Sequence, residues 1–256
     1  MKNAFVETEN YARFQSALKE LERRGADEAR LIIVDGEPGL GKTTILDRWA
    51  TQTGCIYMRA AKQWTPIWFL ETLLGAFRLP APSSFKRGFG QAMDALVQRR
   101  TACALARRPF AVVIDEADHI SRSIDIVESI RDFCDIAEVP FVLVGMGKIR
   151  ANLTRYPQVT SRVSKYVRFE RASLADVRAL MDGLCDVPVA DDLVGFTRQA
   201  ADGFNREVKE AIANIERFGK RNGNGEGNPV RLAQMAGQTL LNDRKSGQPI
   251  IVPEAL

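Results

Sequence analysis

Several kinds of residue are scarce in this chain of 256 residues, and each shortage excludes a class of protein. The chain has one histidine and four cysteines, and no C-x-x-C spacing, so the pattern indicates neither a zinc site nor a disulfide framework. No apolar run approaches the length of a membrane span, and the first residues lack the apolar core of a signal peptide. We therefore expect a protein of the reducing cytoplasm without a membrane partner.

The hydrophobic and charged fractions of the chain are those of a folded protein. Hydrophobic residues make up 45% and charged residues 27%, both ordinary values. The net charge of +4 permits nucleic-acid binding without indicating it, because clustering of cations is the useful signal. A chain of this length can bury a real core as one α/β domain with an appendage, or as two modest domains.

One segment, residues 36–43, carries most of the information in the sequence. It follows the apolar run 31–34 and precedes a helical pattern, which is the context of the G-x-x-x-x-G-K-[ST] phosphate-binding loop, or P-loop. Glycines let successive N–H groups turn toward phosphate oxygens, and the start of the helix adds its positive dipole. We expect Lys42 to reach the β- and γ-phosphates of ATP and Thr43 to be a ligand of Mg²⁺. The expected nucleotide-binding residues are Gly36, Glu37, Pro38, Gly39, Leu40, Gly41, Lys42, Thr43 and Thr44.

A second segment, residues 110–116, is an apolar run that ends in two carboxylates. Ligands bind at the carboxyl ends of parallel strands, so Asp115 and Glu116 are expected to face the P-loop. We assign Asp115 to Mg²⁺ or its waters, and Glu116 to the general base that polarises the attacking water. A solvated turn is the alternative interpretation, but a glutamate directly after the aspartate indicates nucleotide hydrolysis.

The pattern along residues 1–171 predicts an α/β nucleotide-binding domain. Short β-like runs alternate with helical patterns, which is typical of a parallel sheet with helices on both faces. The turn-rich segment 79–88 is expected to be a loop. Strands are expected at 30–35, 55–60, 110–115, 141–145 and 166–169, and helices near 8–24, 43–52, 66–78, 88–106 and 123–137.

Residues 172–256 have a different character and predict a small all-helical lid. Ser173 and Asp176 match a capping box at the start of its first helix. The glycines of segment 219–229 alternate with polar residues, so this segment is expected to be flexible. Further helices are expected near 190–201, 204–218 and 230–244.

The P-loop, the pair Asp115-Glu116 and the lid together resemble the AAA+ ATPases, over about residues 5–245. The resemblance implies a P-loop NTPase fold with a five-stranded parallel sheet and a Mg²⁺-dependent ATP hydrolase. It also implies an arginine finger supplied to a neighbouring subunit, which we assign to Arg162 with Arg155 as the alternative, and a sensor-2 arginine, which we assign to Arg206. One element departs from the family pattern. Met146 occupies the sensor-1 position and cannot orient a water, so we expect either slow hydrolysis or another residue in this role.

The amino-acid sequences of residues 36–41 and 115–119 resemble the corresponding motifs of the transposition ATPases, the family of the phage Mu B protein, TniB and TnsC. This resemblance implies a protein of a phage or mobile element in a bacterial cell. Such a protein forms an ATP-dependent homo-oligomeric filament on double-stranded DNA without sequence preference. It takes part in DNA transposition and recombination by delivering target DNA to a transposase, which in turn stimulates its ATP hydrolysis. Mu B carries an N-terminal helix-turn-helix region, whereas about thirty-five residues precede this P-loop. DNA binding is therefore expected from the ATPase body.

Loosely placed loop cations suffice for contact with DNA phosphates, which gives salt-sensitive affinity without sequence preference. A solvated surface cation is the alternative interpretation for each candidate. Two other functions stay open: a helicase-loader ATPase similar to IstB or DnaC, and an ATP-gated regulatory switch that does not bind DNA. The expected DNA-binding residues are Lys62, Lys86, Arg87, Lys148 and Arg150.

Overall fold

The computed structural model describes residues 1–21, 29–225 and 227–254. The chain forms two compact units. The sheet unit comprises Arg13–Glu37 and Lys42–Phe169, and the lid unit comprises Met1–Ala12, Pro38–Gly41 and Glu170–Leu256. The middle of the P-loop therefore groups with the lid unit.

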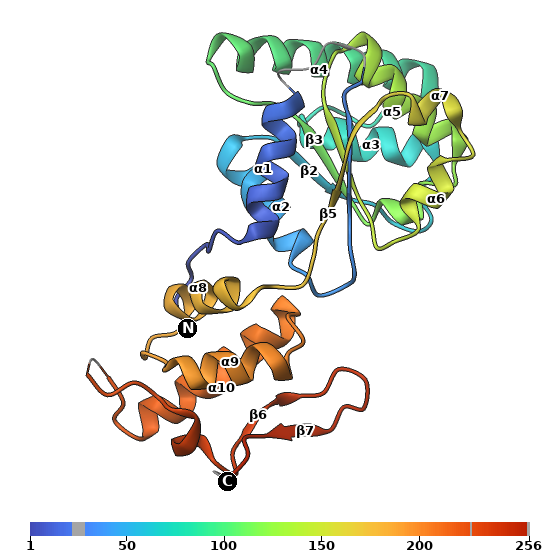
Figure 1. The fold of residues 1–256 in the computed structure, drawn as a ribbon. Helices are drawn as coiled ribbons and strands as arrows, with labels where there is room; N and C mark the ends of the chain where they lie inside the picture. Colours follow the sequence, from blue (N-terminus) through green and yellow to red (C-terminus); the bar gives the residue numbers. More distant parts are fainter. Residues whose placement is uncertain (22–28, 226, 255–256) are drawn as a thin grey trace. The chain divides into compact units, whose positions relative to one another are not determined.

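The sheet unit contains a five-stranded sheet in the order β2-β3-β4-β1-β5, with every pair parallel (Figure 1). Strands β1, β3 and β4 consist mainly of valine, isoleucine and leucine, and these apolar residues are buried, as expected for the centre of a parallel sheet. The predicted five-stranded parallel fold is confirmed. The strands are β1 Leu31–Asp35, β2 Ile56–Arg59, β3 Val112–Asp115, β4 Phe141–Val144 and β5 Val163–Arg168.

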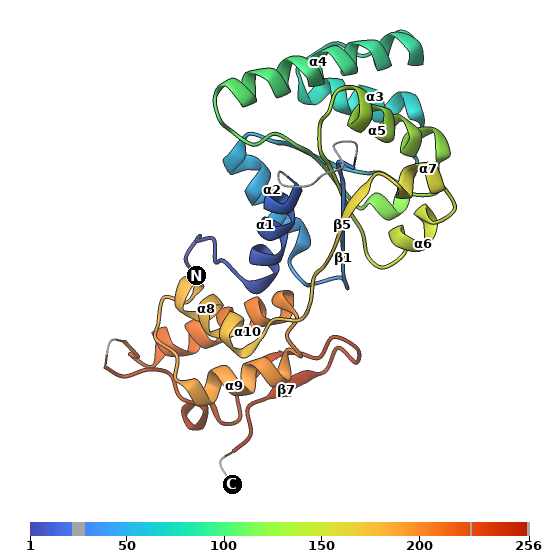
Figure 2. The same ribbon diagram turned by 45° about the horizontal axis from the view of Figure 1, so that its top comes forward.

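Helices cover both faces of this sheet (Figures 1 and 2). On one face, the Phe14 ring packs edge-on against Trp49 with centroids 5.1 Å apart. On the other face, Phe133 stacks on Phe141 of β4. Within the described part of the chain, no helix combines the length and apolar character that crossing a membrane requires. The helices are α1 Glu9–Leu21, α2 Lys42–Thr53, α3 Pro66–Ala76, α4 Phe85–Leu105, the short η1 Ala117–His119, α5 Ile124–Ile136, α6 Ile149–Leu153 and α7 Pro157–Thr160.

Helix α4 begins earlier than the sequence predicted, and the expected loop is correspondingly shorter. Ser84 is the N-cap, and its hydroxyl accepts a hydrogen bond from the Arg87 N–H at 3.3 Å. Gly88, which suggested a turn, lies inside the helix, where a Cβ atom would be 2.7 Å from the Pro82 side chain. Lys86 and Arg87 therefore lie in the first helical turn, and their placement on a loop was wrong.

The lid unit contains α8 Leu174–Leu184, α9 Asp191–Ala200 and α10 Asn205–Arg221. The capping box of Ser173 and Asp176 is confirmed at the start of α8. Helix α10 runs past Gly219, which is buried and whose Cβ position would lie 2.8 Å from the side chains of Val187 and Val230, so close packing requires a glycine there. The segment expected to be flexible from residue 219 is thus helical up to Arg221.

The last part of the lid unit is not helical, so the helix expected over 230–244 was wrong. A short η2 at Leu232–Met235 is followed by an antiparallel hairpin of β6 Thr239–Asn242 and β7 Pro249–Ile251. The carboxylate of Asp243 accepts hydrogen bonds from the N–H groups of Lys245 and Ser246, which stabilises a turn that overrides the helical pattern.

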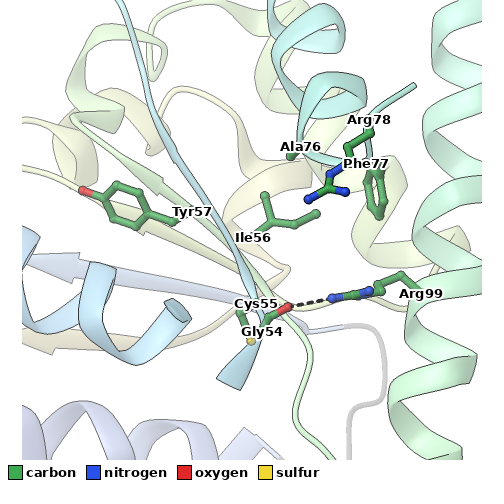
Figure 3. A pocket seen from close by; sticks show the side chains of 8 residues that line it. All are labelled: Gly54, Cys55, Ile56, Tyr57, Ala76, Phe77, Arg78 and Arg99. Atoms are coloured by element: carbon green, nitrogen blue, oxygen red, sulfur yellow. Dashed lines mark hydrogen bonds between the residues drawn. The ribbon is translucent and has the colours of Figure 1, made fainter. Parts of the chain in front are cut away.

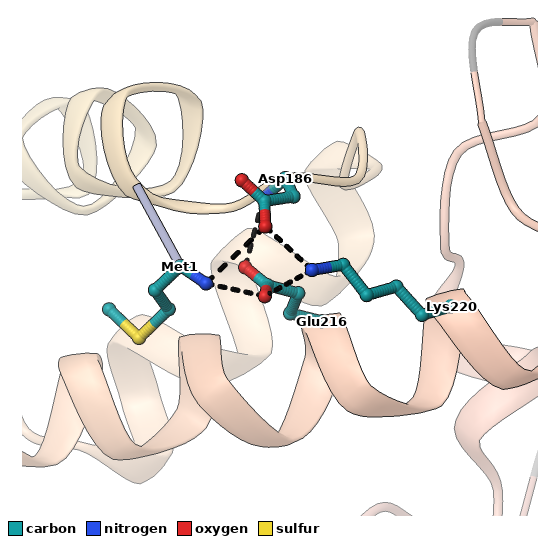
Figure 4. Close-up of polar contacts among 4 residues, drawn as sticks. All are labelled: Met1, Asp186, Glu216 and Lys220. Atoms are coloured by element: carbon teal, nitrogen blue, oxygen red, sulfur yellow. Dashed lines mark hydrogen bonds and ion pairs between the residues drawn. The ribbon is translucent and has the colours of Figure 1, made fainter. Parts of the chain in front are cut away.

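A cluster of charges joins parts of the lid unit that are distant in sequence (Figure 4). The Lys220 ammonium lies 2.6 Å from Asp186 and 2.8 Å from the buried Glu216. The Met1 ammonium lies 2.5 Å from the same glutamate. The hydrogen bond from Lys220 lowers the pKa of Asp186 to about 2. The cluster thus compensates the charge of a buried carboxylate on α10.

Candidate active site

The P-loop has the backbone that its sequence requires. Strand β1 ends at Asp35 and helix α2 begins at Lys42, as the motif predicts. Gly39 and Gly41 have φ angles of +95° and +86°, in the left-handed region that glycine adopts without strain. The Asp35 carboxylate accepts hydrogen bonds from the N–H of Gly36 at 2.8 Å and of Gly147 at 2.5 Å, so it ties the loop to the turn after β4.

Lys42 is buried, and its ammonium donates hydrogen bonds to the carbonyl oxygens of Gly36 at 2.5 Å and Glu37 at 2.9 Å. Burial lowers the pKa of Lys42, while the charges of Asp35 and Asp115 oppose that shift. The ammonium thus lies in the loop among carboxylates. In this position a phosphate would replace carbonyl oxygens as its hydrogen-bond acceptor.

Asp115, at the end of β3, receives hydrogen bonds from two hydroxyl groups. Thr43 Oγ1 donates to Asp115 Oδ2 at 2.6 Å, and Tyr57 Oη donates to the same oxygen at 2.7 Å. Mg²⁺ binds oxygen ligands and is held by one or two carboxylates together with substrate phosphates, so the residues present fit this ion. Thr43 and Asp115 would hold it, directly or through water. The ion would neutralise charge on the nucleotide phosphates.

Glu116 follows Asp115 in a strained conformation. Its φ and ψ are 56° and 32°, a left-handed backbone that costs a residue with a side chain roughly 1–2 kcal/mol. Such strain is found preferentially at functional sites. Its carboxylate lies 3.2 Å from Arg59 Nη2, and this ion pair restrains the side chain. A restrained carboxylate thus follows Asp115 directly in the chain, and its role as the general base stays a prediction.

Asp118 organises the turn after β4, where a sensor-1 residue was expected. Its carboxylate accepts hydrogen bonds from the backbone N–H of Met146 and, at 3.0 Å, of Lys148. The Met146 side chain is exposed. A thioether cannot orient a water as a polar sensor side chain does, and slow hydrolysis stays a prediction.

Sequence reasoning missed Tyr57, Arg59 and Asp118. Strand β2 carries no motif, and its role follows from its register, which pairs Arg59 with Asp115. The available signal was a polar residue, Arg59, at the end of the strand next to β3, which carries the paired acids. For Asp118, the signal was its position three residues after Asp115, in the acidic segment 115–118.

The two arginines predicted to act on the phosphates lie in different settings. Arg162 precedes β5, so it lies at the amino edge of the parallel sheet, whereas Asp115 lies at the carboxyl edge. Its Nε contacts both oxygens of Asp135 at 2.9 and 3.0 Å. The structure therefore does not bring Arg162 to Asp115 within one subunit. Arg206 is exposed at the start of α10, and its backbone N–H donates to the Gly39 carbonyl at 3.2 Å.

The predicted DNA-binding cations are all exposed. Lys62 follows the carboxyl end of β2, and Lys148 follows that of β4, the two strands that flank β3. The Arg150 guanidinium lies 4.9 Å from the centroid of the Tyr166 ring. The starts of α3 and α4 adjoin, because residues from both line one pocket. Lys86 and Arg87, in the first turn of α4, are therefore near the helix that follows Lys62.

A separate pocket of about 540 Å³ lies at the start of β2, away from the acids. Arg78 and Arg99 line it, and Arg99 Nη2 donates to the Gly54 carbonyl at 3.3 Å (Figure 3). Tyr57 also lines it, but its hydroxyl points away from both arginines and toward Asp115. This pocket is therefore not the site at the P-loop.

Comparison with known protein families identifies the type of domain. A family model described as "AAA domain" matches residues 23–153, which include the P-loop, Asp115 and Glu116. No curated protein sequence matches the chain.

Several solved structures share the fold. Cdc6p from Pyrobaculum aerophilum matches with a TM-score of 0.63 and 14% identity over 91% of this chain and 68% of that chain. The Aeropyrum pernix ORC1 protein in complex with DNA matches with a TM-score of 0.57 and 17% identity over 86% and 62%. The Thermotoga maritima RuvB Holliday junction branch migration motor matches with a TM-score of 0.55 and 17% identity over 88% and 66%. The chain thus spans roughly two thirds of these proteins, and the likeness establishes the fold alone.

Proposed function

Since this chain belongs to the AAA domain family of P-loop ATPases and is an ATP hydrolase, we propose that it assembles with ATP on double-stranded DNA and presents that DNA to a transposase. The observation that carries the proposal is the position of Lys62 and Lys148. These exposed cations follow the two strands that flank β3, at the edge where β3 ends in Asp115 and is followed by Glu116. The proposed location is the cytoplasm of a bacterial host cell.

This placement gives ATP a way to control DNA binding. Each subunit offers only a few cations to the phosphate backbone, so a single subunit should bind weakly. An oligomer sums these contacts, and its affinity rises steeply. Thr43 and Asp115 lie at the same edge, so a nucleotide bound there is near the loops that carry the cations.

The solved relatives support DNA as the partner. One was determined in complex with DNA, and another is a branch migration motor for Holliday junctions. The specific role in transposition rests on the resemblance of residues 36–41 and 115–119 to the transposition ATPases. The proposed filament and the proposed transposase partner rest on the same resemblance.

Electron microscopy of the purified protein with linear DNA tests the proposal. We expect filaments with a non-hydrolysable ATP analogue, none without nucleotide, and none for Lys42→Ala. Failure to bind DNA in any nucleotide state would contradict the proposal and favour an ATP-gated switch. Helicase loading in a direct assay, without stimulation by a transposase, would instead identify a helicase loader.

A further inference from the structure

The first turn of α10 is bonded to the middle of the P-loop, and both belong to the lid unit. The buried Asn205 donates a hydrogen bond from Nδ2 to the Leu40 carbonyl at 3.1 Å. The backbone N–H of Arg206 donates to the Gly39 carbonyl at 3.2 Å. Two consecutive P-loop carbonyls therefore point toward the start of this helix.

These two bonds determine the direction of the neighbouring N–H groups. In a trans peptide, the C=O and the following N–H point to opposite sides. When the carbonyls of Gly39 and Leu40 point toward α10, the N–H groups of Leu40 and Gly41 must point away from it. A phosphate site of this kind consists of consecutive N–H groups that point into one concavity. Bonds from α10 to the carbonyls therefore leave these N–H groups free to point toward a phosphate.

The contact between Asn205 and the P-loop is close, and a glycine occupies position 41, where it occurs. A Cβ atom on Gly41 would lie 2.8 Å from Asn205 Nδ2, and the φ of +86° at this position also favours glycine. The N-cap residue of α10, Phe204, forms no side-chain capping bond. The Gly39 carbonyl instead satisfies an N–H of the first turn, which otherwise has no partner within the helix. The P-loop and α10 thus complete each other's hydrogen bonding.

Phe204 holds this helix start in place. Its ring contacts the guanidinium groups of Arg171 and Arg244, whose Cζ atoms lie 4.7 and 4.1 Å from the ring centroid. Arg244 belongs to the turn between β6 and β7, so the hairpin contributes to the same support. Nη1 of Arg244 is also 3.3 Å from the Cβ position of Gly39.

We propose that Asn205 is a positioning residue of the P-loop, which orients the N–H groups of Leu40 and Gly41 for nucleotide phosphates. It does not touch the phosphate; it acts through the Leu40 carbonyl. The proposal rests on the P-loop as the phosphate site and is independent of DNA and transposase, so either proposal can fail alone.

Calorimetric titration with Mg·ADP and with inorganic triphosphate tests this role. Asn205→Ala removes the donor, and Asn205→Asp replaces it with an acceptor of similar shape. Loss of one such bond should weaken both ligands by about 5- to 10-fold. Equal loss for the two ligands places the effect at the phosphates, because inorganic triphosphate has no base or ribose.

Asn214→Ala is the matched control. Asn214 lies on the same helix, and its Nδ2 donates to the Leu240 carbonyl at 2.9 Å, so the variant loses the same kind of bond away from the P-loop. We expect it to bind both ligands within about twofold of the parent, with a thermal midpoint lowered as much as in Asn205→Ala. Parent-like affinity in both Asn205 variants would overturn the proposal. An equal loss of affinity in Asn214→Ala would also overturn it, since lid stability would then be the cause. Unchanged affinity in Lys42→Ala would overturn its premise.

Discussion

The Tyr57 hydroxyl donates a 2.7 Å hydrogen bond to the same Asp115 oxygen that accepts from Thr43. Burial is the main cause of a raised pKa for the Tyr57 phenol, and the bond to Asp115 adds to it. The phenol therefore remains protonated and a donor through the neutral range. Strand β2 thus holds the carboxylate that is expected to bind Mg²⁺.

Replacing Tyr57 by phenylalanine should raise the Mg²⁺ concentration for half-maximal ATPase by about 3- to 10-fold, as expected for one hydrogen bond to a carboxylate. The cause is a carboxylate that is less well oriented. Tyr156→Phe removes a comparable bond, from the Tyr156 hydroxyl to the Arg122 carbonyl at 3.0 Å, and should leave this requirement unchanged. An identical Mg²⁺ dependence in Tyr57→Phe and the parent would exclude this role.

Glu116→Gln should slow ATP hydrolysis by roughly 10²–10⁴-fold while ATP binding is preserved, because the amide cannot accept the proton of the attacking water. Lys42→Ala should weaken ATP binding itself. Single-turnover hydrolysis and equilibrium binding, measured on both variants, separate the two effects. Unchanged turnover in Glu116→Gln would remove this residue from the catalytic step.

Arg162→Ala should bind ATP but fail to hydrolyse it in the assembly, if the arginine acts on a neighbouring subunit. Its pair with Asp135 is partly exposed and contributes about 0–1 kcal/mol, so it can be released. Mixing Arg162→Ala with Glu116→Gln should restore some activity, because one kind of interface then pairs both intact residues. Asp135→Ala controls for loss of the ion pair, and the same defect in that variant would indicate a structural role.

The double variant Lys86→Ala/Arg87→Ala should lower DNA affinity and flatten the slope of log K against log salt, by about one unit for each DNA phosphate that the variant no longer neutralises. Basal ATPase should stay near that of the parent. DNA titrations at several salt concentrations measure the change, and Arg107→Ala/Arg108→Ala, at two exposed arginines just after α4, is the control. Affinity and slope equal to the parent's would show that the DNA path lies elsewhere.

The cluster of Asp186, Glu216 and Lys220 predicts a pH dependence of lid stability. The folded pKa of Asp186, about 2, lies below its ordinary value of 3.8. Its contribution is therefore fully present above about pH 4 and is lost as the pH falls toward 2. The difference in thermal midpoint between the parent and Lys220→Ala should be largest from pH 5 to 7 and shrink toward pH 3. Lys209→Ala, on the same helix, should show no such trend; a constant difference for Lys220→Ala would contradict the assignment.

The sequence by itself determined the features that contiguous residues encode. The glycines and Lys42 of the P-loop, the carboxylates after an apolar run, and the capping box at Ser173 each depend on neighbours within a few residues. Their backbone conformations and hydrogen bonds are therefore local, and composition and spacing suffice to predict them. The alternation of short apolar runs with helical patterns likewise predicted the parallel sheet.

Only the tertiary structure decided which distant residues meet at the site. Arg59 reaches Glu116 because β2 pairs in register with β3, and Asn205 reaches Leu40 from a helix far along the chain. The hairpin 239–251 also overrode a helical pattern, since its pairing and the Asp243 turn outweigh weak intrinsic propensity. Strand register and packing between remote segments depend on the whole fold, so no local pattern in the sequence records them.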